Sequence, residues 1–269
     1  MLVSSKDLIL QARKKKYAIG SFNFSNLETL KAIISAGEKL KSPLIVSTTE
    51  KAIAYAKVEY LSALAQKAAA QSPLPIVLNL DHGKSLETVS LCLENGYTSV
   101  MIDSSHLPFK NNITITKQVV ELAHRQNVPV EGELGELGTQ SFTDVSQVRQ
   151  FVEQTGVDFL AVALGSAHGV QKEEHLNLEI LEEITKQTTI PLVLHGGSGL
   201  PDEDIKQAIR KGICKINIDT DIRTAFKQGL KEGLAKDESD FREILKFSIE
   251  DMIKVVEDKI KLFGSENKA

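Results

Sequence analysis

Eight short apolar runs alternate along the chain with longer amphipathic segments, and this alternation constrains the fold more than any other feature. The runs are Ala18–Phe22, Leu44–Ser47, Ile76–Leu80, Ser99–Ile102, Val128–Gly132, Phe159–Ala163, Leu192–Leu194 and Ile213–Ile218. Most of them are continuously apolar rather than alternating, which is typical of parallel strands that are covered on both faces. They therefore predict eight parallel strands.

The segments between these runs have the apolar period of helices. They are Asn26–Leu40, Tyr60–Gln71, Ser85–Asn95, Ile113–Gln126, Val145–Gln154, Leu178–Lys186, Pro201–Lys211 and Asp219–Leu234, with Ser5–Lys14 leading the first run. Eight βα repeats in 269 residues predict an α/β fold, the (β/α)8 TIM barrel, as a single domain over residues 1–269. We expect a C-terminal helical extension at about 237–269, centred on Phe247–Phe263, with a frayed polar end. An open doubly wound sheet is the alternative, but no G-x-G-x-x-G follows the first run.

Charge and composition exclude several classes of partner. The net charge is −4, Trp is absent, and the only basic run is Arg13–Lys16, so we expect no nucleic-acid partner. No apolar run approaches the ~20 residues that span a bilayer, and the N-terminus lacks the pattern of a signal peptide. We therefore expect no membrane partner. Cys92 and Cys214 form no metal-type or redox-type pair, so the expected location is a reducing cytoplasm.

Three of the six histidines follow predicted strands, and each is followed directly by glycine. They are His82, His168 and His195. Strands of a barrel present their C-terminal ends on one rim, where catalytic residues of this fold lie. Three neutral imidazoles with an open fourth position are a common catalytic zinc site. A single histidine at a strand end is more often structural, but three on one rim predict a metal; His106, His124 and His175 are expected to be surface or structural residues.

The loops after the last two predicted strands have the features of an anion site. Gly196-Gly197-Ser198-Gly199 precedes one predicted helix, and Asp219-Thr220 opens the next. Free N–H groups at a helix start bind anions, and phosphate sites of barrels are commonly formed by these two loops. Ordinary helix capping by Ser198 and Asp219 is the alternative. Beside a metal rim, the two loops favour a phosphorylated small-molecule substrate.

Six motifs together resemble one enzyme family. They are LNLDHG (78–83), MIDSSHLPF (101–109), VEGELG (130–135), TGVDFLAVALGSAHG (155–169), PLVLHGGSGLPDEDI (191–205) and KINIDTDIR (215–223). They resemble the class II ketose-bisphosphate aldolases, which include the fructose-1,6-bisphosphate and tagatose-1,6-bisphosphate enzymes, and the similarity covers nearly the whole chain. The resemblance implies zinc-dependent, reversible cleavage of a phosphorylated ketose to dihydroxyacetone phosphate and an aldehyde. It also implies a homodimer or homotetramer.

The resemblance also implies a role for individual residues. His82, His168 and His195 would hold one Zn2+ ion, and Glu133 and Asp103 match carboxylates near the metal. Asp81 would move the proton of the C4 hydroxyl, and Asn217 would steady the enediolate. The remaining positions match binding residues. Gly169, Gly196, Ser198, Asp219 and Thr220 match the dihydroxyacetone phosphate site, with a monovalent cation (Na+ or K+); Asn23 and Thr49 line the rest of the pocket; Arg242 matches an arginine that reaches the distal phosphate of a neighbouring subunit.

The segment after the ELG motif departs from the family pattern. A loop glutamate of the family exchanges the proton on dihydroxyacetone phosphate, but Ser141 and Phe142 stand where an acidic pair is usual. The loop is also about a dozen residues shorter than in the family. Three interpretations stay open: Glu136 or Asp144 replaces the acid, the enzyme acts on a different ketose phosphate, or the chain is a sugar-phosphate-binding regulator without turnover.

Two lysines add further questions. Lys51 stands where the family usually has glycine, and it either contacts a phosphate, narrows the pocket or is simply exposed. Lys215 lies two residues before Asn217 in the last predicted strand, so both side chains should point into the barrel. A buried lysine can form a Schiff base, which would make a metal-free aldolase. The alternative interpretation is a lysine paired with an acid in the barrel interior.

Overall fold

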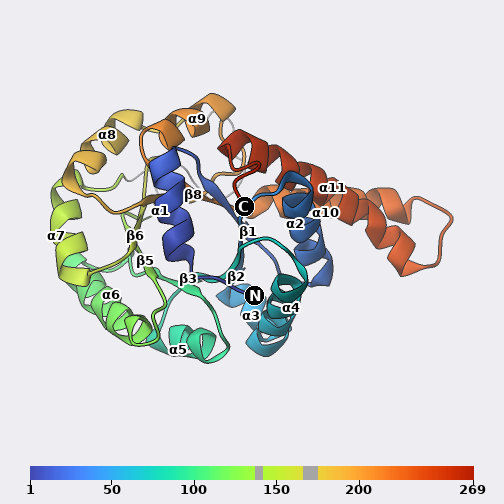
Figure 1. Cartoon of the computed structure of the whole chain (residues 1–269), viewed down its shortest axis with the longest axis horizontal. Coiled ribbons are helices and arrows are strands. Elements are labelled where there is room, and N and C mark those ends of the chain that lie inside the picture. Colours follow the sequence, from blue (N-terminus) through green and yellow to red (C-terminus); the bar gives the residue numbers. More distant parts are fainter. Residues whose placement is uncertain (137–141, 166–174) are drawn as a thin grey trace.

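The computed structural model describes residues 1–136, 142–165 and 175–269, and its strands form a closed parallel barrel (Figure 1). Each strand pairs with the next in sequence, and β1 pairs with β8 to close the ring. The strands are β1 (Ile19–Asn23), β2 (Leu44–Thr49), β3 (Ile76–Gly83), β4 (Ser99–Ile102), β5 (Val130–Leu134), β6 (Phe159–Val162), β7 (Leu192–Leu194) and β8 (Ile213–Ile218). The predicted TIM barrel is confirmed, and the open sheet is wrong.

Helices surround this barrel, mostly where the apolar period predicts them. They are α1 (Ser5–Lys15), α2 (Leu27–Leu40), α4 (Val58–Gln71), α5 (Leu86–Glu94), α6 (Phe109–His124), α7 (Val145–Thr155), α8 (Leu178–Gln187), α9 (Asp202–Arg210) and α10 (Thr220–Leu234). The sequence interpretation missed α3 (Glu50–Ala56), which Thr49 caps by accepting a hydrogen bond from the Ala52 N–H at 3.2 Å. Seven residues are too few for an apolar period to be recognised.

The C-terminal extension differs from the expectation at both of its ends. Helix α11 (Phe241–Phe263) begins six residues before the predicted Phe247, because Asp240 caps it by accepting from the Arg242 N–H. The expected frayed end is wrong, since the N–H groups of residues 267–269 donate to the carbonyls of Leu40 and Lys41 at 2.9–3.1 Å. Together α10 and α11 project beyond the barrel (Figure 1).

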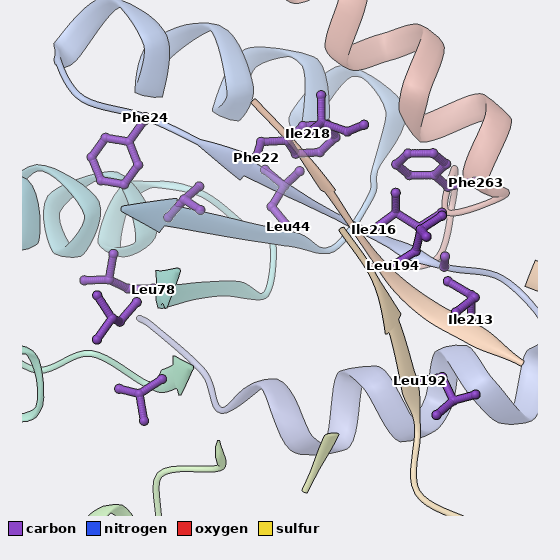
Figure 2. Close-up of a cluster of buried hydrophobic side chains, with 14 of the residues drawn as sticks. Phe22, Phe24, Leu44, Leu78, Leu192, Leu194, Ile213, Ile216, Ile218 and Phe263 are labelled. Carbon is purple, nitrogen blue, oxygen red and sulfur yellow. The ribbon is translucent and has the colours of Figure 1, made fainter. Parts of the chain in front are cut away.

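Two apolar layers hold the barrel. The outer layer lies between strands and helices, and Figure 2 shows Phe22, Leu44, Ile216 and Phe263 within it. The inner layer fills the barrel near its N-terminal end, which α1 covers. Its members are Ile9 and Ala12 of α1 with Tyr17, Ile19, Ile45, Val77, Met101, Phe159, Ala161, Val193 and Cys214.

In β3 and β8 the inward-facing side chains become polar or charged toward the C-terminal end of the strand. In β3 they are Val77, then Asn79, then Asp81, because side chains of a strand alternate between its two faces. In β8 Lys215 is followed by Asn217 in the same way. The apolar layer therefore closes one end of the barrel, and polar groups gather at the other. Among the described residues, no helix is long and apolar enough to cross a membrane.

Candidate active site

A pocket of about 490 Å³ opens at the C-terminal end of the barrel. Its size is that of an ordinary small-molecule site. It runs over the ends of β1 to β4, β7 and β8, so the fold brings together residues that are far apart in sequence. The sequence-predicted residues that line it are Asn23, Thr49, Asp81, His82, Asp103, His195, Gly196, Ser198, Asn217, Asp219 and Thr220.

The end of β3 turns two consecutive side chains toward this pocket. Asp81 and His82 both line it, although neighbours in a regular strand point to opposite faces. The backbone of His82 has φ +49°, and the pairing with β4 shifts register between Leu80 and Gly83. A Cβ on Gly83 would lie 2.7 Å from the Met101 carbonyl oxygen, so only glycine fits this turn. The DHG sequence thus supplies the irregularity that the site needs.

His82 and His195 face each other inside the pocket. The Nε2 atom of His82 lies 2.9 Å from Nδ1 of His195, and the two rings are nearly perpendicular. Each histidine uses its other nitrogen on a carboxylate: His82 Nδ1 is 2.9 Å from Asp103, and His195 Nε2 is 2.7 Å from Glu131. Carboxylates accept hydrogen bonds, so the ring protons lie on these outer nitrogens. The two inner nitrogens are then arranged to share a cation, either a proton or a metal ion.

The acidic groups around His82 fit a cation as well. Ligand atoms of Asp81, His82 and His195 lie within 4.8 Å of one another, and so do those of His82, Asp103 and Glu133. Glu133 is buried, its Oε2 is 3.6 Å from His82 Nδ1, and that oxygen has no hydrogen-bond partner. A buried acceptor without a donor is costly unless a cation compensates it. These residues therefore fit a bound metal ion.

The same carboxylates shift the ionisation of the site. Burial lowers the pKa of His82, but the charges of Asp81, Asp103 and Glu133 outweigh it and raise the pKa to about 9. Burial, with the nearby charge of Asp103, raises the pKa of Glu133 to about 8. Without a metal, His82 is protonated at neutral pH, so a metal that binds there has to displace a proton.

Asp81 is held ionised at the centre of the pocket. The side-chain amides of Asn23 and Asn217 each donate to one of its carboxylate oxygens at 2.8 Å. Burial raises the pKa of Asp81, but His82, His195 and Lys215 together with the Asn23 hydrogen bond lower it below its ordinary value. A buried carboxylate that stays charged beside histidines can accept a proton from a substrate hydroxyl.

Glu131 is the site residue whose role the sequence interpretation missed. It is buried under His195 and also binds Lys215, whose Nζ lies 2.6 Å from its Oε2. Glu131 and Glu133 are two residues apart and share one face of β5, which is the signal that could have found both. Lys215 is 1% exposed, and it lies in the barrel interior paired with an acid.

The loops after β7 and β8 form the other end of the pocket. Gly196 has φ +66°, a conformation that favours glycine, and Ser198 Oγ accepts from the Asp221 N–H at 3.2 Å. Asp219 makes no side-chain cap on α10, contrary to the capping alternative; it pairs instead with Arg223 at 2.9 Å. Burial, the largest cause, raises the pKa of Asp219.

Two sequence-predicted residues lie outside this pocket, and three further predicted or noted residues are not among those that the structure describes. Arg242 is exposed at the start of α11, where it binds Asp240, and it does not line the pocket. Glu136 is exposed just past β5 and does not line it either. His168, Gly169 and Ser141 lie outside the described residues.

Phe142 and Thr143, which precede α7, are bonded to the chain just after β6. Phe142 forms a bridge with Leu164, and the Thr143 N–H donates to the Ala163 carbonyl at 3.0 Å. The Ala163 N–H donates in turn to Thr143 Oγ1 at 2.8 Å. The chain is therefore attached to the barrel rim only a few residues after the ELG motif.

Comparison with known proteins identifies the family. Residues 3–268 match the family model described as fructose-bisphosphate aldolase class-II. The chain belongs to this family. It is therefore a class II aldolase, a lyase that cleaves ketose bisphosphates by aldol cleavage, and the family uses a metal and a sugar-phosphate substrate.

Individual relatives match this aldolase from end to end. A probable fructose-bisphosphate aldolase of Bacillus subtilis (strain 168) and a fructose-bisphosphate aldolase of Geobacillus stearothermophilus are each 41% identical, over 100% of this chain and 99% of the relative. The crystal structure of the YdjI aldolase from Escherichia coli K12 is 37% identical with a TM-score of 0.93, and all of both chains is covered. Both alignments with the bacilli run over 285 positions, more than the 269 residues here, so those relatives carry segments that this aldolase lacks.

Proposed function

We propose that this class II aldolase uses one Zn2+ ion per chain, held by His82, His168 and His195, with Glu133 and Asp103 beside it. The observation that carries the proposal is the facing pair of His82 and His195, whose outer nitrogens are both held by carboxylates. Imidazole nitrogens suit zinc, and three of them leave a position for substrate. When bound, the metal supplies a Lewis acid that polarises the C2 carbonyl of the ketose.

Asp81 is the proposed base. Its carboxylate takes the proton of the C4 hydroxyl, which starts cleavage of the C3–C4 bond and releases the aldehyde. In the reverse direction the protonated Asp81 returns this proton to the new hydroxyl. Asn23 and Asn217 orient its two oxygens, and Asn217 also lies 3.3 Å from His195, where it can donate to negative charge that develops on the substrate.

The phosphate of the dihydroxyacetone half is proposed to bind at the β7 and β8 loops. Gly196, Ser198, Asp219 and Thr220 line that end of the pocket, and Gly169 is assigned to the same site by the family resemblance alone. Asp219 does not cap the first turn of α10; Ser198 Oγ accepts from its Asp221 N–H, and the other N–H groups of this turn are offered to an anion. Asp219 and the phosphate repel each other unless positive charge lies near them. Arg223, paired with Asp219, supplies one such charge, and the monovalent cation (Na+ or K+) that the resemblance implies would supply another.

Three further assignments stay predictions. Arg242 is assigned to the distal phosphate of a neighbouring subunit, and its exposed position on the projecting α11 agrees with a role outside its own pocket. That role requires the predicted homodimer or homotetramer. A cytoplasmic location is likewise expected from the sequence.

The Schiff-base alternative has little support. Lys215 is buried, does not line the pocket, and is bound to Glu131 as an ion pair. A protonated lysine whose proton is held by a carboxylate is not a nucleophile. Class II aldolases are moreover the metal-dependent class. We therefore assign Lys215 to holding Glu131, which in turn binds His195.

A cleavage panel tests the proposed function directly. We expect cleavage of at least one of fructose 1,6-bisphosphate, tagatose 1,6-bisphosphate and their 1-monophosphates, measured by release of dihydroxyacetone phosphate. A chelator should abolish it, and Zn2+ should restore it. Full activity after exhaustive chelation would contradict the metal, and no cleavage of any ketose phosphate by the zinc-loaded protein would favour the sugar-phosphate-binding regulator.

The missing loop acid leads to a separate prediction. We expect proton exchange into dihydroxyacetone phosphate to be slow, because Ser141 and Phe142 replace the acidic pair and the short loop shields the site less from water. Glu136, three residues after Glu133, is the best candidate substitute. The measurement is deuterium exchange into dihydroxyacetone phosphate by the wild type and by Glu136→Gln. Exchange unaffected by that change would remove Glu136 as the substitute, and fast exchange with rapid fructose-bisphosphate turnover would contradict any effect of the short loop.

A further inference from the structure

The start of α10 carries two carboxylates beside the proposed phosphate site, and each pairs with a different basic side chain. Asp219 pairs with Arg223 of the same helix at 2.9 Å. Asp221 pairs with Lys259 of α11, whose Nζ lies 2.8 Å from its Oδ2. The C-terminal extension therefore supplies a positive charge at the rim of the barrel, where α10 begins after β8. The sequence interpretation assigned no role to Asp221 or Lys259.

The Asp221–Lys259 pair is partly shielded from solvent. Its side chains are 20% and 14% exposed, and both line a groove of about 560 Å³ between α10 and α11, which run side by side (Figure 1). A second ion pair of this groove is more open, since Lys254, which binds Asp251 at 2.9 Å, is 72% exposed. Water and salt screen exposed charges strongly and partly buried charges much less. Without Lys259, the charge of Asp221 would therefore act on its surroundings.

The neighbours of Asp221 belong to the proposed phosphate site. Its N–H donates to Ser198 Oγ at 3.2 Å, which holds the β7 loop against the first turn of α10. Ser198 and Thr220 line the pocket, whereas Asp221 lines the groove against α11. The carboxylate of Asp221 therefore lies behind the groups proposed to receive the phosphate, and it acts on the phosphate through its charge rather than by contact.

A phosphate at this position meets two opposing effects. The N-terminus of a helix attracts an anion, but a carboxylate in the same turn already uses part of that attraction. A phosphate monoester carries about −1.5 to −2 charges near neutral pH, so each acid of the turn that lacks a counter-charge repels it. Arg223 supplies the counter-charge for Asp219, and Lys259 supplies it for Asp221.

We propose that Lys259 is a positioning residue for the dihydroxyacetone phosphate half of the substrate: it neutralises Asp221, and the first turn of α10 can then receive the phosphate. The effect falls on phosphate binding and not on C–C cleavage, because Lys259 acts through a carboxylate that lies behind the phosphate site. The inference rests on the proposed function, which places the phosphate at this turn.

The signs of the two charges distinguish this role from a purely structural one. The zinc-loaded wild type is compared with Lys259→Met, Lys259→Arg, Asp221→Asn and the double variant Asp221→Asn/Lys259→Met, by calorimetric titration with dihydroxyacetone phosphate at low and at high salt. An ion pair that only holds α11 in place would be lost equally in both single variants. Lys254→Met is the matched control, because Lys254 is five residues earlier on α11 and also pairs with an aspartate.

We expect Lys259→Met to weaken binding of dihydroxyacetone phosphate about three- to tenfold at low salt, the scale of one uncompensated charge near a protein surface. High salt should reduce this difference. Asp221→Asn should bind more tightly than the wild type, the double variant and Lys259→Arg about as well as the wild type, and Lys254→Met like the wild type. In the cleavage direction, Lys259→Met should change kcat less than about twofold.

Four results would overturn the role of Lys259: unchanged binding in Lys259→Met, weaker or equal binding in Asp221→Asn, no recovery in the double variant, or a loss that salt leaves unchanged. If Lys259→Met does not fold, Asp221→Asn alone decides by the direction of its change. The wild type separates the two proposals. Failure of the zinc-loaded wild type to bind dihydroxyacetone phosphate would contradict the proposed function and this inference with it, whereas binding that these variants leave unchanged would contradict only the inference.

Discussion

Replacing Asp81 with asparagine is expected to lower aldol cleavage about 100-fold or more while leaving metal content unchanged. The loss follows from removing the proposed base, and positioned acid–base groups commonly contribute on this scale. Asparagine has nearly the shape of aspartate and keeps one acceptor oxygen, but it cannot take a proton near neutral pH. The measurement is kcat for cleavage of the best ketose phosphate, alongside elemental analysis for zinc.

The surroundings of Asp81 indicate that this variant folds. Its new NH2 group would face a donor amide of Asn23 or Asn217, and both of those amides carry a buried oxygen that has no hydrogen-bond partner. Rotating the Asn23 amide would turn its oxygen toward the new NH2 group and restore the contact. Glu203→Gln, at an exposed position on α9, is the control for loss of a carboxylate. Turnover like that of the wild type in Asp81→Asn would reject the assigned role.

Metal binding should fail when either facing histidine is removed. We expect His82→Ala and His195→Ala to lose most bound zinc, because each removes one of three proposed ligands and three is the usual minimum for a catalytic site. His124→Ala is the control, since His124 binds Asp158 near the opposite end of the barrel. Full zinc occupancy in His82→Ala would show that the site is assigned to the wrong residues.

A weaker effect on zinc affinity is expected for Glu131, which contacts the proposed ligand His195 and not the metal itself. Glu131→Gln keeps the shape of the side chain beneath His195 but removes the charge that holds both the imidazole and Lys215. Carboxylates in this position commonly change metal affinity by 10- to 100-fold. Titration of the metal-free protein with Zn2+ should therefore rank the wild type above Glu131→Gln, and Glu131→Gln above His195→Ala. Equal Zn2+ affinity of the wild type and Glu131→Gln would mean that the charge of Glu131 has no role in metal binding and that its ion pair with Lys215 is structural.

The missing loop acid bears on the choice of substrate. The chain keeps the residues proposed for C–C cleavage, yet its resemblance to the family implies that it lacks the usual loop acid. The cleavage panel and the exchange measurement test the effect of this change separately.

The sequence by itself determined the barrel and most of the candidate site. Parallel strands that are covered on both faces have to be apolar throughout, so all eight could be located from the runs alone. Because strand ends share one rim, residues such as His82, Asp81 and His195 could be expected to meet without any structure. The family motifs then assigned their chemistry. What sequence patterns detect is a period or a motif, and the seven-residue α3 has neither.

Only the tertiary structure decided how these groups are oriented and paired. The positive φ of His82 turns two neighbours into one pocket, and the choice of ring nitrogen follows from where Asp103 and Glu131 lie. The sequence leaves Lys215 open as a nucleophile or as an ion-pair partner, and the 2.6 Å contact with Glu131, 84 positions away, supports the ion pair. Contacts of this kind join residues that are distant along the chain, so their geometry is set by the packing of the whole barrel and has no local signal in the sequence.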